Sequence, residues 1–122
     1  MRERGQATVE FAFCLPFVAL LLAALFEVGM VLSDQVRLWH AAREAARVAV
    51  VDPDPAAARR AAEGVGLEDV VADVTPDRTG RRQGEPLTVS LTYQPTGRMP
   101  LIGELFERLQ LRARATMRIE QP

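Results

Sequence analysis

The chain begins with an apolar segment long enough to cross a lipid bilayer. No charged side chain occurs from Phe11 to Phe26, and the apolar run resumes at Val28 and continues to Leu32. The run spans about 22 residues, and a helix needs about 20 residues at a rise of about 1.5 Å each to cross a bilayer core. The sequence therefore predicts one membrane-spanning helix near the N-terminus.

Two kinds of processed N-terminal signal fit this segment poorly. A secretory signal has an apolar core of about 7 to 15 residues and small residues at its cleavage site, whereas this run is longer and ends in Leu32 to Gln35. Lipoprotein processing at Cys14 is disfavoured because the bulky Phe13 precedes it. A single cysteine also excludes an intramolecular disulfide and a multi-cysteine metal site.

Charge predicts the orientation of this helix. Arg2 and Arg4 lie directly before the span, and basic residues beside a span are retained in the cytoplasm. We therefore expect a cytoplasmic N-terminus, a single pass through the membrane and an extracytoplasmic C-terminal part.

Two carboxylates interrupt the apolar run. Glu10 lies at its start, and Glu27 lies about five residues from its outer end. A charge at the centre of a bilayer costs about 2.5 to 3.5 kcal/mol on insertion scales, so each acid needs a polar partner or the headgroups. Glu27 is expected either to reach the headgroups or to contact another helix in a complex, where Gly29 would allow close approach.

Beyond the membrane the helix is expected to continue as a stalk. Residues 33–51 contain neither Pro nor Gly and are rich in Ala and Arg, which favour helices. A helix from Gln6 to Val51 would be about 69 Å long, and Pro16 is expected to kink it near its start. Polar residues lie along one side of this stalk helix. On the opposite side, a stripe of apolar residues can pack on a folded domain. The polar residues are Arg37, His40, Glu44 and Arg47, and the stripe contains Leu38, Ala42, Ala45 and Ala49.

The remaining residues predict a small α+β domain. Asp54 followed by Pro55 is typical of a helix start, and this short helix is expected to end at Glu63 before Gly64. Residues 70–75, 87–93 and 111–120 each alternate between apolar and polar side chains, as half-buried strands do. We expect one three-stranded antiparallel sheet with one face on the long helix.

The connection between the last two predicted strands is amphipathic. Its apolar residues are Leu101, Ile102, Leu105, Phe106 and Leu109. It could form a helical turn that covers the sheet edge, which is the interpretation we favour, or it could contact a partner. A domain of about 70 residues without a disulfide has a small core, so it is expected to depend on the long helix or on other subunits.

Neither nucleic-acid binding nor catalysis is favoured. The net charge is −1, and Arg112, Arg114 and Arg118 lie on one face of a strand outside the membrane, which we interpret as a solvated sheet face. The chain has one His and no GxSxG, HExxH or phosphate-binding loop. We expect no enzyme activity, catalytic residue, cofactor, metal or small-molecule substrate.

Residues 4–13, RGQATVEFAF, resemble the class III signal peptide of type IV pilin-like proteins. In those proteins a prepilin peptidase cuts after a glycine, and a glutamate lies five residues beyond the cut. The resemblance implies a cut between Gly5 and Gln6 and identifies Glu10 as that glutamate. In assembled pilins the glutamate pairs with the amino terminus of a neighbouring subunit, so Glu10 is expected to set subunit register and assembly.

The residues that follow are similar to the TadE-like family of the tight adherence (Tad) pilus system. Its members share an E-F-A opening, a Leu-Pro step, a second Glu near a Gly late in the span, and an A-A-R-E-A-A-R segment. Glu10, Pro16, Glu27, Gly29 and residues 41–47 match these features in order. The resemblance is strong over residues 4–51 and implies a pilin-like lollipop fold.

This resemblance implies an organisation and a function. Residues 1–5 would be a cytoplasmic leader, 6–32 the transmembrane segment, 33–51 the helix extension and 52–122 the extracytoplasmic domain. The implied function is a minor pilin or pseudopilin-like structural subunit of a Tad (type IVc) pilus, located in the bacterial cytoplasmic membrane and, after assembly, in the pilus. Its partners would be the prepilin peptidase, other pilin-like subunits and the Tad assembly machinery. The alternative is an unprocessed single-pass anchor whose outer domain binds a protein partner.

Overall fold

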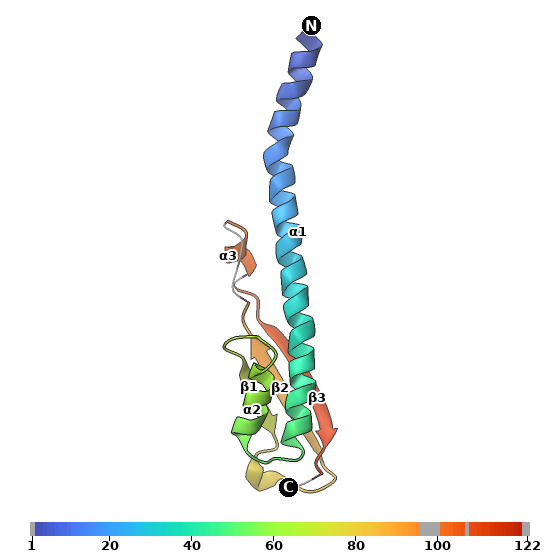
Figure 1. Cartoon of the computed structure of the whole chain (residues 1–122), viewed down its shortest axis with the longest axis vertical. Coiled ribbons are helices and arrows are strands. Elements are labelled where there is room, and N and C mark those ends of the chain that lie inside the picture. The colour runs from blue at the N-terminus through green and yellow to red at the C-terminus, as the bar shows by residue number, and fades with distance from the viewer. Residues whose placement is uncertain (1, 96–100, 107, 121–122) are drawn as a thin grey trace.

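A single long helix dominates the computed structural model, which describes residues 2–95, 101–106 and 108–120. Helix α1 (Arg2–Ala49) extends far beyond the small domain that lies against its C-terminal part (Figure 1). The chain then forms α2 (Pro55–Glu63), β1 (Val71–Thr75), a short 3-10 helix η1 (Arg78–Gly80), β2 (Pro86–Tyr93), α3 (Gly103–Phe106) and β3 (Leu111–Arg118). This arrangement confirms the predicted α+β fold.

Helix α1 begins and ends close to the predicted positions. It includes residues 2–5, ahead of the expected start at Gln6, and its last residue is Ala49 rather than Val51. Pro16 lies inside the helix, which continues through it as one element and curves gently (Figure 1). The helix ends shortly before Pro53, because a proline disfavours helical backbone in the residue that precedes it.

The short helix α2 has the bounds that its capping residues predict. The Asp54 carboxylate accepts a hydrogen bond from the backbone N–H of Ala56 at 3.0 Å, and Pro55 occupies the first turn. At the other end, the N–H of Gly64 donates to the carbonyl oxygen of Arg60 at 3.2 Å, and the N–H of Val65 donates to that of Ala62 at 3.4 Å. These contacts satisfy backbone groups that a helix leaves without partners at its ends.

The three strands form one antiparallel sheet in the order β1-β2-β3. The central strand β2 places Val89 opposite Val74 on β1 and Ala115 on β3. Alternate side chains of β2 are buried, and the residues between them are half-buried, which confirms the predicted two-residue period. Thr88 and Thr116 share a hydrogen bond between their hydroxyl groups at 2.9 Å on the outer face.

The core lies between α1 and the inner face of the sheet. The predicted stripe of α1 is buried, and its alanines allow the helix backbone to approach the branched side chains of β2 closely. On the helix, Leu38, Ala41, Ala42, Ala45, Ala46 and Ala49 contribute, and on β2, Leu87, Val89, Leu91 and Tyr93. The domain therefore includes the C-terminal part of α1 as one of its layers.

Arg81 holds the end of α1 against the domain, a contact that sequence reasoning missed. Its side chain is 7% exposed, and its Nη1 donates to the carbonyl oxygens of Ala49 at 2.9 Å and Asp52 at 3.4 Å. The last carbonyls of a helix lack partners within the helix and carry partial negative charge, so a guanidinium is favourable there. The backbone N–H of Glu120 adds a hydrogen bond to the Val50 carbonyl at 3.2 Å.

Replacing Arg81 should destabilise the domain, whereas replacing its neighbour should not. Arg81→Leu removes a buried hydrogen bond to the Ala49 carbonyl and a part-buried one to the Asp52 carbonyl, so the free energy of unfolding should fall by about 1–3 kcal/mol. The matched control Arg82→Leu changes an exposed side chain and should remain within about 0.5 kcal/mol. Urea unfolding of the full chain in detergent micelles can be followed by the fluorescence of Trp39, which lines a groove with β2 and β3. Equal losses in both variants would contradict this role.

Candidate functional site

The N-terminal part of α1 exposes large apolar side chains on every side. Phe11, Phe13 and Phe17 are 69%, 72% and 74% exposed. A helix that is apolar all round requires an apolar environment, either a protein core or a membrane. Within the described residues, α1 is the one helix that is long and apolar enough to cross a membrane, by length and composition.

Gly5, Gln6 and Glu10 lie together on the first turns of this helix. All three are exposed. The Gln6 side-chain Nε2 donates to Glu10 Oε1 at 3.2 Å, as residues one turn apart can. Around Gly5 the space is open, with no other atom within 4 Å of the position that a Cβ would occupy. The Glu10 carboxylate therefore faces outward, where another molecule can reach it.

Glu27 has a different environment from Glu10. It is 2% exposed, although Phe26 and Val28 beside it are 54% and 40% exposed. Asp34 is 1% exposed, and because it lies seven residues further on, it shares a helix face with Glu27. Both carboxylates have interaction partners. Glu27 is thus buried within its own chain, which neither of the two sequence alternatives, the headgroups or another helix, had anticipated.

Gly29 lies on the opposite side of α1 from Glu27. Two residues turn a helix by about 200°, and Gly29 is exposed where Glu27 is buried. No other atom lies within 4 Å of a Cβ built on Gly29. The structure therefore does not bring these two predicted site residues together, and a contact through Gly29 would use a separate face.

The connection between β2 and β3 lies beside the middle of α1. The structure describes Gln94, Pro95 and residues 101–106 and 108–110 of this connection. Figure 1 shows α3, which belongs to it, next to α1 and away from the sheet. In this view α3 does not cover the sheet edge, as the favoured expectation had it, and residues 96–100 and 107 of the connection lie outside the described residues. The alternating pattern of the strands does not determine the direction in which a long connection leaves the sheet.

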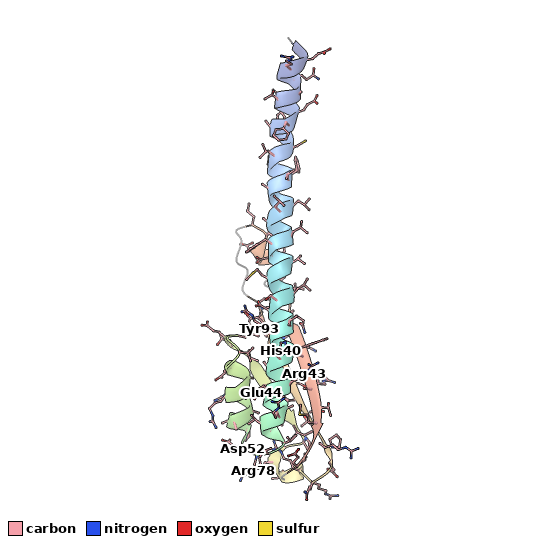
Figure 2. The ribbon with its side chains drawn as sticks, turned by 45° about the vertical axis from the view of Figure 1, so that its right-hand side comes forward. His40, Arg43, Glu44, Asp52, Arg78 and Tyr93 are labelled. Carbon is pink, nitrogen blue, oxygen red and sulfur yellow. The ribbon has the colours of Figure 1, made fainter. Side chains whose placement is uncertain are left out.

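The stalk carries exposed polar residues without a catalytic arrangement. Figure 2 labels His40, Arg43 and Glu44 along the part of α1 that packs on the domain. Asp52 and Arg78 lie at the end of the domain that is distant from the N-terminus. Glu44 forms an exposed ion pair with Arg47 at 3.7 Å, a type of pair that contributes little stability. Among the described residues, no group of three or more His, Cys, Asp or Glu is placed to hold a metal ion.

A shallow groove lies where Trp39 of α1 meets β2 and β3. It is lined by Trp39 of α1, by Ser90, Leu91 and Thr92 of β2, and by Arg112, Ala113 and Arg114 of β3. This lining holds neither an acid, a histidine nor a cysteine. The groove therefore has no pair of groups for general acid and base catalysis.

These features define a chain with one apolar helix of membrane-spanning length and composition and a small α+β domain packed on the same helix. Residues 5–47 match the family model described as TadE-like protein, which confirms the predicted resemblance to the TadE-like family. The match lies within α1 and covers about a third of the chain. No curated protein and no solved structure matches it. The family is a structural one related to pili, and it suggests a subunit associated with the Tad pilus.

The open space at Gly29 predicts that larger residues there leave the folded chain intact. Gly29→Leu should not lower the free energy of unfolding, because the side chain meets no atom and leucine favours helix more than glycine does. The matched control Ala45→Leu enlarges a fully buried residue of the same helix and should cost about 1–3 kcal/mol. Urea unfolding in micelles measures both. A loss for Gly29→Leu as large as that for Ala45→Leu would contradict the assigned face.

Proposed function

We propose that this chain is a minor pilin or pseudopilin-like structural subunit of a Tad (type IVc) pilus. The TadE match over residues 5–47 carries the proposal, because it includes the predicted cleavage site, both acids of the span and the stalk. The exposed apolar surface of α1 supports it, since such a helix can lie first in a membrane and then among neighbouring helices. The subunit would take part in pilus assembly, adhesion or secretion.

The proposed topology follows from charge and from the position of the domain. Residues 1–5 form a cytoplasmic leader with Arg2 and Arg4, and residues 6–32 cross the cytoplasmic membrane. Residues 33–51 extend the helix, and residues 52–122 form the extracytoplasmic domain. The domain packs on the end of α1 distant from the leader (Figure 1), which is compatible with this order.

Prepilin peptidase is the proposed processing partner, and it cuts between Gly5 and Gln6. The residues around Gly5 are exposed, so the backbone is accessible. Glycine lowers helix stability by about 1 kcal/mol relative to alanine, which favours local opening of the first turns. Cleavage would remove both leader arginines and create a free amine at Gln6, one turn before Glu10.

Glu10 is proposed to pair with the new amine of a neighbouring subunit. Its carboxylate is exposed within its own chain and contacts there only the neutral Gln6 amide among the hydrogen bonds described. In an apolar surrounding, an unpaired charge is costly, whereas an amine and a carboxylate attract strongly. A charge that is satisfied in one relative position of two helices sets their register as well as their affinity.

Processing at Gly5 can be tested on the mature N-terminus. In cells with prepilin peptidase, the unaltered chain and the control Gly29→Leu should begin at Gln6, whereas Gly5→Leu should keep Met1, because the bulky side chain blocks the peptidase. Intact mass and N-terminal sequencing of the chain from membranes distinguish these forms, and peptidase-deficient cells provide the reference. A start at Met1 in every strain would favour the alternative of an unprocessed anchor whose domain binds a protein partner.

The role of Glu10 can be tested without changing processing. Glu10→Gln keeps the size of the side chain and removes its charge, so cleavage should continue while crosslinked complexes with other pilin-like subunits fall at least about tenfold. Such a loss corresponds to about 1.4 kcal/mol of pairing free energy. The control Glu3→Gln alters an exposed acid of the leader and should have no effect after cleavage. Normal complex formation by Glu10→Gln would refute the charge pairing and favour a carboxylate that only reaches the headgroups.

A further inference from the structure

The connection between β2 and β3 leaves the sheet at the level where the apolar run of α1 ends. Tyr93 and Leu111 form the last pair of these strands. Next to this pair, the Gln35 side-chain Nε2 donates to the Arg112 carbonyl oxygen at 3.0 Å. Gln35 lies three residues after Leu32, the outer end of the apolar run. From this point the connection extends towards the N-terminal end of α1, and both views show α3 beside the helix (Figures 1 and 2).

One side of the connection faces the protein. Pro95, Ile102 and Gly103 are buried. On α1, the burial of Glu27 and Asp34 is confined to one face, since Phe26 and Val28 remain exposed. The connection is the segment that lies beside this part of the helix (Figure 1). The burial of Glu27 at this part of the helix means that its side chain is shielded from the surroundings within the chain.

The other side of the connection exposes leucines. Leu101, Leu105 and Leu109 are 85%, 74% and 43% exposed. Large apolar side chains of α1, such as Val28 and Leu32, are exposed as well. Three exposed leucines within nine residues of one connection favour a contact surface over a solvated one. Because the neighbouring surface belongs to the membrane-spanning segment, the surrounding medium at this level is lipid.

Charged residues on the same connection limit its depth. Glu104 and Arg108 are both exposed, and they would be unfavourable among acyl chains. Apolar side chains combined with charges are typical of segments that lie at the boundary between headgroups and acyl chains. The position of the connection near the outer end of the span agrees with this depth.

We propose that the β2–β3 connection is a second membrane contact, which places Leu101, Leu105 and Leu109 in the outer leaflet of the bilayer. This inference rests on the proposed membrane anchoring by α1. The contact fixes the rotation of the domain about α1 relative to the membrane surface and keeps Glu27 away from lipid. When the subunit leaves the bilayer, the three leucines lose their lipid contact, so neighbouring subunits must then cover them.

The proposal can be tested by measuring the depth of single fluorescent labels. In a Cys14→Ala background, which has no cysteine, Leu105→Cys is labelled with an environment-sensitive fluorophore and the full chain is placed in phosphatidylethanolamine–phosphatidylglycerol vesicles. Leu101→Cys provides a second site on the connection. Leu22→Cys, on the exposed surface of the span, and Glu68→Cys, on the exposed surface of the domain, are matched controls. All four positions are exposed, so the labels should not disturb the core.

Brominated acyl chains should quench the fluorophores at positions 105 and 101, and aqueous iodide should not. The fluorophore at position 22 should behave in the same way. The label at 68 should show the reverse. Quenching of 105 and 101 by iodide alone would overturn the proposal, and so would protection from both quenchers, which would indicate a protein partner such as a second copy. If the label at 22 also escapes brominated lipid, membrane anchoring itself fails, which distinguishes that failure from failure of the second contact alone.

Discussion

The packing of the α1 alanine stripe on the inner face of the sheet is the contact on which the domain depends. Ala42, Ala45 and Ala46 are almost completely buried against the branched side chains of β2. A domain of about 70 residues buries a small surface area on folding and is only marginally stable on its own. Helix α1 supplies one of its two layers. Because the same helix continues into the apolar span without a break, the domain and the anchor are mechanically one element, and a rotation of either moves the other.

The two acids of the apolar run have opposite surroundings. Glu10 is exposed on the first turns, whereas Glu27 and Asp34 are covered on one face of the middle of α1. A carboxylate in an apolar medium is stable only with a partner. Glu27 is buried and has an interaction inside the chain. Glu10 lacks such shelter and is exposed to whatever surrounds the helix.

Local patterns predicted most of the fold and part of the candidate site. The caps at Asp54 and Gly64 depend on adjacent residues, and the alternation along β2 depends on strand geometry, so each can be recognised in a short window. Arg81 and Asp34 could not be found in this way. The contact of Arg81 with the Ala49 carbonyl joins residues 32 positions apart, and a buried acid resembles an exposed one in sequence. A weak signal did exist for Asp34, which shares a helix face with Glu27 at a spacing of seven.

The sequence by itself determined the apolar span, the helical stalk, the strands and the resemblance to TadE-like proteins, because hydrophobic period and local propensity act over a few residues. Only the tertiary structure decided that Glu27 is buried and that α3 of the β2–β3 connection lies beside α1. Those outcomes depend on the direction in which a connection leaves the sheet and on the surface it then covers. They arise from contacts between segments far apart in the chain, which no local pattern encodes.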